Sequence, residues 1–256
     1  MTYCLAARLS AGLVFVADSR TNAGIDQLGV YSKMHPFLDL EGRFFTLLSA
    51  GNLATTQAVV ARLHRDIREG AAKNLASFQR IRDAADYIGE TSRAVQKLHA
   101  GNDGADDFSP TADFIFGGQI GDAPTALFHI YPQGNYVAPT ALAPFLQIGE
   151  LKYGKPILDR IIRPDTELEL AARCGLVSMD STMRSNAGVG PPIELMMYRS
   201  DRRSPPVHRV FAEDDPYLKV IRDAWAENLR KAVEALPPIR LGESQVHLVD
   251  HRNKDG

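Results

Sequence analysis

Short apolar runs separated by glycine-containing turns dominate the first fifty residues. Residues 2–8 and 12–18 form two such runs, and Gly12 supplies the backbone freedom that a hairpin turn between them needs. Two further runs of strand length follow at Val30–His35 and Arg43–Ser49. This pattern predicts an N-terminal hairpin followed by more sheet.

After Gly51 the apolar positions change to a spacing of three and four residues. Apolar side chains recur in this way over 54–67 and again over 78–98. Such a spacing places them on one face of a helix. The pattern therefore predicts two adjacent helices, ending near Gly70 and His99, that cover one face of the sheet.

The succession of strands and helices then repeats. Three short β-rich runs connected by turns predict an antiparallel meander over 112–138. Beyond the meander the pattern predicts a helix pair, two strands and a long helix, at Tyr153–Ile162, Thr166–Arg184, Ile193–Arg199, His208–Ala212 and Asp215–Ala235. Strands followed by helices, twice over, fit two antiparallel sheets stacked face to face with helices on both outer faces. We therefore predict an α+β fold, a four-layer α/β/β/α sandwich, as one domain over 1–252 with a short frayed tail at 253–256.

Composition and charge exclude several classes of protein. The 256 residues carry 29 Lys and Arg against 31 Asp and Glu, a net charge of -2 that lacks the basic excess of a dedicated nucleic-acid binder. No apolar run approaches the roughly 20 residues of a membrane helix, so we expect no membrane partner. Cys4 and Cys174 are too few for a disulfide framework, which favours a reduced, cytoplasmic setting.

The sequence indicates neither a metal nor a nucleotide cofactor. The seven histidines show no HExxH or comparable ligand spacing. The glycines at 117–118 and 149–154 match neither a Walker A loop nor the GxGxxG pattern. Cys4, two residues from Thr2, is expected to pack as a small apolar side chain rather than to act as a nucleophile.

The residue after the first methionine has chemistry of its own. Removal of Met1 ahead of a small side chain would leave Thr2 with a free α-amine. The hydroxyl of such a residue can attack a carbonyl while its own amine, with an ordinary pKa of about 7.7–8.0, accepts the proton. A threonine at this position is equally an ordinary second residue. Other residues are therefore needed to distinguish a nucleophile from an ordinary threonine.

An aspartate and a lysine follow at the ends of predicted strands. Asp18 ends the run VFVAD, and Lys33 lies in the run VYSKMHPF. A lysine ammonium beside Thr2 would lower the pKa of the hydroxyl and disfavour protonation of the amine, while Asp18 would orient the lysine. Taken alone, the two residues are equally well explained by a surface ion pair.

These residues, in this order and spacing, resemble the β-subunits of the proteasome. The shared features are an N-terminal threonine, a strand that runs into Ala17–Arg20 (ADSR), a following lysine, and the segment Ser49–Ala54 (SAGNLA) that opens a helix. A closer resemblance, to the Anbu family of bacterial proteasome-type proteins, lies in VADSRTNAG (Val16–Gly24), LLSAGNLATTQAV (Leu47–Val59) and IGELKYGKPILDR (Ile148–Arg160). The resemblance extends over nearly the whole chain.

The resemblance implies roles for individual residues. Thr2 is similar to the N-terminal nucleophile, and Asp18 and Lys33 are similar to its charge partners. Gly51 is similar to the oxyanion-hole glycine; it lies between an apolar strand and a helix N-terminus, where a backbone N–H and the helix dipole suit a developing oxyanion. Arg20 would serve structure near the site. By the same resemblance, the substrate cleft would be lined by Thr21, Asn22, Ser49 and Leu53.

Two supporting features of proteasome β-subunits have no clear counterpart. Where those subunits have a serine in a glycine-rich turn, this chain has Gly149-Glu150-Leu151. The region 180–186 offers several candidates for the second aspartate and its serine, and Asp180 and Ser185 are two of them. Weaker support of the nucleophile is compatible with a slower enzyme, a different leaving group or a site that depends on assembly.

The resemblance implies a threonine-type peptidase that cleaves the amide bond of a peptide or small amide substrate through an acyl-enzyme on Thr2. It also implies a self-compartmentalising homo-oligomer, ring-like or helical, and leaves open whether an ATPase partner supplies it. Two alternatives stay open. One is a non-peptide amidase or acylase that uses the same nucleophile, and the other is an assembly scaffold with a weak or idle site.

Overall fold

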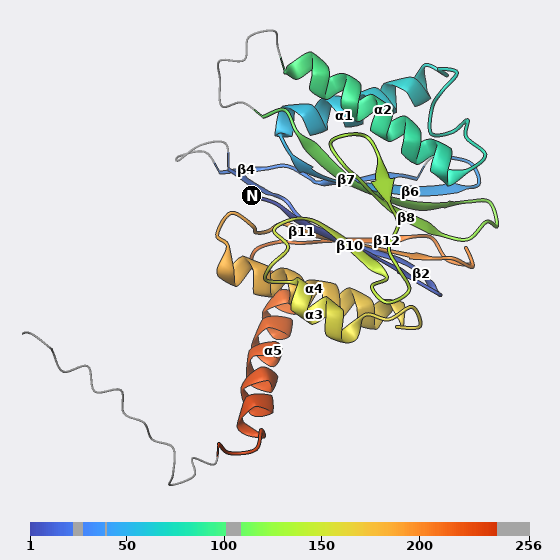
Figure 1. The fold of residues 1–256 in the computed structure, drawn as a ribbon. Coiled ribbons are helices and arrows are strands. Elements are labelled where there is room, and N and C mark those ends of the chain that lie inside the picture. Colours follow the sequence, from blue (N-terminus) through green and yellow to red (C-terminus); the bar gives the residue numbers. More distant parts are fainter. Residues whose placement is uncertain (23–27, 39, 101–108, 240–256) are drawn as a thin grey trace, which may run out of the picture.

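Two five-stranded antiparallel sheets form the centre of the computed structural model, which describes residues 1–22, 28–38, 40–100 and 109–239 (Figure 1). The first sheet has the strand order β10-β1-β2-β11-β12, made of β10 (Phe145–Gly149), β1 (Tyr3–Leu9), β2 (Gly12–Asp18), β11 (Ile193–Arg199) and β12 (Val207–Phe211). The second has the order β5-β6-β7-β8-β9, made of β5 (Met34–Phe37), β6 (Arg43–Gly51), β7 (Ala112–Ile120), β8 (Ala126–Ile130) and β9 (Tyr136–Val137). The predicted N-terminal hairpin is confirmed, because β1 and β2 pair antiparallel around Leu9 and Gly12.

Helices cover the outer face of each sheet. The second sheet carries α1 (Leu53–Arg68) and α2 (Ile81–His99), and the first carries α3 (Lys155–Ile161) and α4 (Leu168–Ser185) (Figure 1). The predicted four-layer α/β/β/α sandwich is therefore confirmed. The last helix, α5 (Pro216–Glu234), projects away from the layers and has only Leu218 buried (Figure 1).

Strand alternation explains why the two sheets pack back to back. Along β1, Tyr3 and Leu5 point into a cluster shared with α3 and α4, while Cys4 and Ala6 point into the cluster between the sheets. Phe15 of β2 joins the cluster between the sheets. A third cluster lies between the second sheet and the helices α1 and α2. The central strands are buried on both faces, and this accounts for their nearly continuous apolar sequences.

Two parts of the sheet prediction were wrong. The predicted strand Val30–His35 is two strands, because β4 (Leu28–Val30) pairs with β3 (Arg20–Asn22) as a separate ribbon and β5 begins only at Met34. Of the residues between β4 and β5, Tyr31 and Ser32 are exposed and only Lys33 is buried. The strand β10 was not predicted, although its backbone pairs with β1. The predicted tail at 253–256 lies outside the described residues, and one domain over 1–252 stays a prediction.

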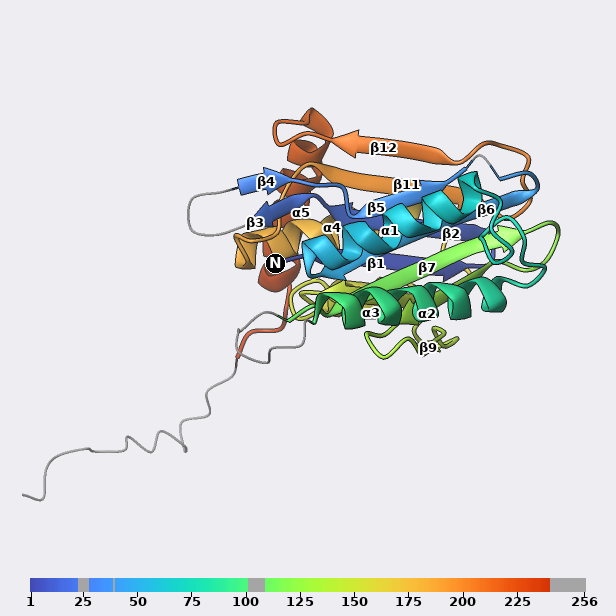
Figure 2. The same ribbon diagram turned by 90° about the horizontal axis from the view of Figure 1, so that it is seen from above.

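Several strands begin or end close together at one edge of the sandwich. The N-terminal end of β1 lies beside the C-terminal end of β2, since Cys4 pairs with Ala17. The second sheet contributes the C-terminal end of β6, where Gly51 leads into α1. Figure 2 shows the N-terminus beside β3 and the first turn of α1. The predicted nucleophile, lysine and glycine therefore come to the same edge from three separate elements.

Candidate active site

A cleft of about 160 Å³ lies at this edge and includes most of the predicted site residues. Its walls come from the N-terminus, the β3–β5 region, the end of β6 and the first turns of α1. The lining residues are Met1, Thr2, Thr21, Ser32, Lys33, His35, Ser49, Ala50, Gly51, Leu53, Thr56 and Gln57. Six residues that the sequence proposed for catalysis or substrate binding are among them.

Asp18 lies beneath the cleft and is paired with Lys33. It is the last residue of β2 and is fully buried; its Oδ1 lies 2.7 Å from Lys33 Nζ. The backbone N–H of Tyr3 donates to the same oxygen at 2.9 Å, and that of Gly190 donates to Oδ2 at 3.3 Å. Burial raises the pKa of the Asp18 carboxyl, while the Lys33 ammonium and the two N–H groups oppose that rise. Three donors on one carboxylate suit its ionised form.

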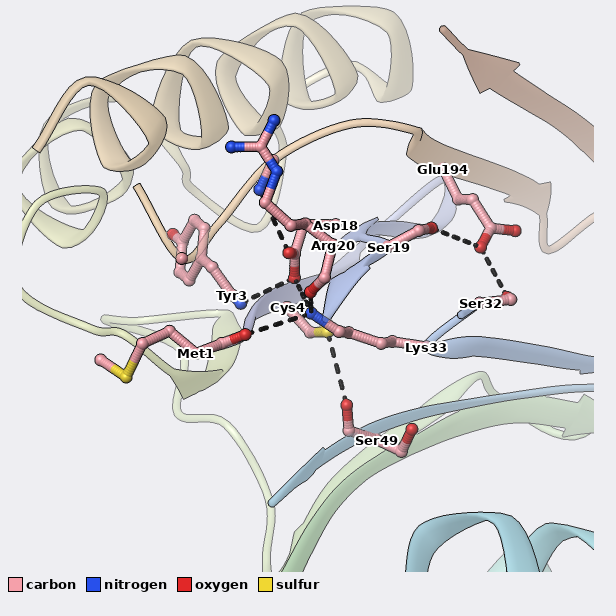
Figure 3. Close-up of polar contacts among 12 residues, drawn as sticks. Met1, Tyr3, Cys4, Asp18, Ser19, Arg20, Ser32, Lys33, Ser49 and Glu194 are labelled. Carbon is pink, nitrogen blue, oxygen red and sulfur yellow. Dashed lines mark hydrogen bonds and ion pairs between the residues drawn. The ribbon is translucent and has the colours of Figure 1, made fainter. Parts of the chain in front are cut away.

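The Lys33 ammonium lies beside the peptide bond that joins Met1 to Thr2. Its Nζ donates to Asp18 and to the backbone carbonyl of Arg20, both at 2.7 Å, and to the carbonyl of Met1 at 3.4 Å (Figure 3). Lysine has three N–H donors, so these acceptors use all of them. The structure thus replaces the alternative of a surface ion pair by a buried pair directed at the N-terminal residues.

Gly51 is an exposed residue with a positive φ of 107° at the end of β6. A Cβ here would lie 2.4 Å from the carbonyl oxygen of Thr111, so the position requires glycine. The next residue, Asn52, caps α1 by accepting the backbone N–H of Thr55 at 3.1 Å. The cleft therefore meets both a glycine backbone and the positive end of a 16-residue helix.

Thr2 is anchored by residues that sequence reasoning did not assign to the site. Its carbonyl accepts the backbone N–H of Glu150 at 2.8 Å, and a Cβ on Gly149 would lie 2.0 Å from the same carbonyl. The Asn186 amide donates to the Glu150 carboxylate at 3.1 Å. The segment Ile148–Arg160 carries part of the family resemblance, but its contact with Thr2 is made by the backbone and therefore leaves no side-chain signal in the sequence.

The supporting residues take different places. Arg20 lines no part of the cleft; its guanidinium donates to the carbonyl of Ala187 at 3.1 Å and faces Glu213 at 3.8 Å. Asp180 is buried in α4, where Arg184 at 3.2 Å and Arg222 at 2.9 Å pair with it.

The other two sequence candidates are Ser185, which does not line the cleft, and Asn22. Ser185 is exposed at the end of α4. Asn22 ends β3, next to residues that lie outside the described part of the chain.

The polar lining residues that sequence reasoning missed are Ser32, His35, Thr56 and Gln57. His35 of β5 lies in the lining and is hydrogen bonded through Nε2 to the Ser49 hydroxyl at 3.1 Å. Ser32 donates to the buried carboxylate of Glu194 at 2.5 Å (Figure 3). Neither His35 nor Ser32 can be recognised as part of a site from the sequence alone. The partner of His35 depends on how β5 and β6 pair, and the partner of Ser32 lies on a strand more than 160 residues away.

The described residues hold no group of three or more His, Cys, Asp or Glu side chains arranged for a metal ion. Cys4 is buried and its Sγ lies 3.8 Å from the carbonyl of Ser49; burial raises the pKa of its thiol. Among the helices described, none is long and apolar enough to cross a membrane.

Comparison with known proteins places the chain in a family. A scan against protein-family models and a search of curated proteins found no match. Among solved structures, Anbu (ancestral beta-subunit) from Yersinia bercovieri is 43% identical with a TM-score of 0.87, covering 94% of this chain and 100% of that one. The helical assembly of the Anbu complex from Pseudomonas aeruginosa is 44% identical with a TM-score of 0.88, covering 93% and 98%. An Anbu (Gly-1) mutant from Hyphomicrobium sp. strain MC1 is 41% identical with a TM-score of 0.85, covering 94% and 100%. The chain belongs to the Anbu family and has its proteasome-like fold.

Proposed function

We propose that this protein is a threonine-type peptidase that hydrolyses amide bonds through an acyl-enzyme on Thr2. The observation that carries the proposal is the Lys33 ammonium, held by Asp18 and Arg20 at 2.7 Å and directed at the Met1 carbonyl at 3.4 Å. Removal of Met1 takes away the weakest of the three acceptors. One N–H of Lys33 then becomes free to act on the hydroxyl of Thr2.

The first half of the reaction forms the acyl-enzyme. Thr2 Oγ attacks the substrate carbonyl carbon, and the free α-amine of Thr2 accepts the hydroxyl proton. Lys33 lowers the pKa of the hydroxyl and favours the neutral amine. Gly51 N–H holds the oxyanion, with the N-terminus of α1 adding to the stabilisation. The C–N bond then breaks, and the leaving amine takes the proton from the α-amine.

The second half releases the acyl group. Water attacks the ester carbonyl carbon and loses a proton to the α-amine. The ester C–O bond breaks, Thr2 Oγ regains the proton, and the acid product leaves. Both halves of the reaction use only groups at this one cleft and a water molecule.

The first experiment is the intact mass of natively expressed protein before and after incubation with a β-lactone. Loss of Met1 and a single adduct on Thr2 are the expected results. Thr2→Ala should remove the adduct, while Thr140→Ala, at an exposed threonine between β9 and β10, should keep it. Retained Met1 or an unlabelled free Thr2 would favour the assembly scaffold.

Labelling alone does not separate a peptidase from a non-peptide amidase. Turnover of a mixed peptide library, followed by mass spectrometry, does so. Peptide products that disappear in Thr2→Ala support the peptidase. A labelled protein that releases no peptide products favours the amidase or acylase.

We further propose that the subunits associate into a ring-like or helical homo-oligomer. The supporting observation is α5, which projects from the body (Figure 1). It exposes apolar side chains such as Val220, Leu229 and Val233. Exposed apolar side chains gathered on one element are typical of association surfaces. The Pseudomonas aeruginosa relative forms a helical assembly.

Light scattering at micromolar concentration tests this association. Leu229→Glu places a charge on the apolar surface and should reduce the mass of the particle. Asn228→Glu adds the same charge at the neighbouring exposed position and should change it less. A monomeric wild-type protein would contradict the proposal.

A further inference from the structure

Polar side chains, rather than apolar ones, dominate the cleft beside Thr2. Thr21, Ser32, His35, Ser49, Thr56 and Gln57 all contribute to its lining. No carboxylate is among the lining residues described, and Lys33 is the one cationic side chain among them. Lys33 is already balanced by Asp18 at 2.7 Å. The side chains of the cleft therefore offer hydrogen bonds without an unbalanced side-chain charge.

The central polar pair is His35 with Ser49. His35 Nε2 and Ser49 Oγ are hydrogen bonded at 3.1 Å across the adjacent strands β5 and β6. Burial, with a smaller effect from His64, lowers the pKa of His35 to about 4, so the imidazole is neutral at neutral pH. A neutral imidazole has one donor and one acceptor, and a hydroxyl has both functions. The pair can thus bond to a group that donates as well as accepts.

Thr21 adds an unpaired hydroxyl to the same cleft. Its Oγ1 is buried and has no hydrogen-bond partner among the residues described. A buried hydroxyl without a partner is unfavourable, and a ligand that supplied the partner would remove the penalty. This is an observation independent of the His35–Ser49 pair, and it also calls for a polar ligand group.

We infer that the cleft beside Thr2 is a specificity pocket for a carboxamide side chain, that of glutamine or asparagine, on the acyl side of the cleaved bond. The assignment of the pocket to that side rests on the proposed function. A carboxamide is neutral and both donates and accepts, so it satisfies His35, Ser49 and Thr21 together. An apolar side chain leaves these groups unpaired, and a carboxylate or ammonium finds no free side-chain counter-charge.

Binding to Thr2→Ala tests the pocket without requiring turnover. The probes are four N-acetyl-Ala-Ala-X amides in which X is Gln, Met, Glu or Lys, with affinities measured by calorimetry. Glutamine should bind at least about tenfold more tightly than methionine, which has similar length but no amide, and more tightly than either charged residue. Equal or tighter binding of methionine, or no binding of any probe, would overturn the inference.

Variants assign the preference to particular residues. His35→Phe and Ser49→Ala, each combined with Thr2→Ala, should abolish the glutamine preference by removing the hydrogen-bonding pair. His64→Phe makes the same change in α1, at a ring stacked on Phe37 outside the cleft, and should preserve the preference. A glutamine preference that survives both pocket variants would also overturn the inference. An unlabelled wild-type Thr2 together with glutamine-selective binding would reject the proposed hydrolase and keep the pocket.

Discussion

Gly149 limits how closely β10 can approach the residue proposed as the nucleophile. Its φ is +85°, and an ideal Cβ would lie 2.0 Å from the carbonyl oxygen of Thr2 and 2.7 Å from the carbonyl carbon. Real Cβ contacts are essentially never below 3.0 Å. Gly149→Ala therefore has to move the Gly149 backbone and the Thr2 carbonyl apart by about 1 Å. That shift acts on the carbonyl that accepts the Glu150 N–H at 2.8 Å.

The expected loss of stability has two parts. An L-residue at positive φ costs about 1–2 kcal/mol, and the overlap with Thr2 adds about 1–3 kcal/mol. The free energy of unfolding should therefore fall by about 2–5 kcal/mol. A displacement of about 1 Å at a reacting group can lower a rate by about a hundredfold, so labelling of Thr2 by a β-lactone should slow by about that factor.

Gly121→Ala is the matched control. Gly121 also has a positive φ, +53°, but a Cβ there meets no atom within 4 Å. Its cost should be confined to the backbone, about 1–2 kcal/mol, with no change in labelling. Urea unfolding followed by circular dichroism, at one protein concentration, measures the stabilities, and mass spectrometry measures the labelling rates. Equal destabilisation by both variants, or wild-type labelling of Gly149→Ala, would refute the role given to this contact.

Two other predictions concern titratable groups. Asp18→Asn leaves the Lys33 ammonium buried without its counter-charge and should cost about 3–5 kcal/mol in urea unfolding, whereas Asp159→Asn, in an exposed pair with Lys155, should cost about 1 kcal/mol or less. Similar losses of stability in the two variants would contradict a buried pair of Asp18 and Lys33. The pKa of His35 is about 4 when folded against 6.5 ordinarily, so the unfolded chain binds more protons between these values. Relative to His35→Gln, the wild-type protein should lose up to about 3 kcal/mol on acidification from pH 6.5 to pH 4; a parallel pH dependence would contradict a neutral, buried His35.

Local patterns predicted most of the secondary structure because the central elements have unambiguous periods. The alternating or continuous apolar runs of β1, β2 and β6 and the helical spacing of α1 correspond to faces that are in fact buried. The strand β10 escaped prediction because its pairing partner, β1, lies about 140 residues away. The ribbon of β3 and β4 was not predicted because β3 is polar and β4 contains a glycine, a composition typical of a loop.

The candidate site was predicted in part. Thr2, Lys33 and Gly51 were assigned through a family pattern, and the structure brings all three to one cleft with Asp18 beneath it. Their catalytic roles stay predictions until Thr2 is labelled. His35 could not be identified in the same way, because its importance depends on the strand register that places it beside Ser49.

The anchoring of Thr2 shows how the proposed nucleophile is held although Glu150, not a serine, follows Gly149. The Thr2 carbonyl is held by a backbone N–H, that of Glu150, rather than by a side-chain hydroxyl. Asn186 then donates to the Glu150 carboxylate and accepts the Gly188 N–H at 2.9 Å, which joins the β10 side of the cleft to the segment after α4. That same segment supplies the Gly190 N–H that holds Asp18. The positions of Thr2, the proposed nucleophile, and of Asp18 are therefore coupled through one short stretch of chain. A substitution at Asn186, which does not line the cleft, should consequently disturb the positions of Thr2 and Asp18 together. Loss of a serine hydroxyl bonded to Thr2 alone would disturb only Thr2.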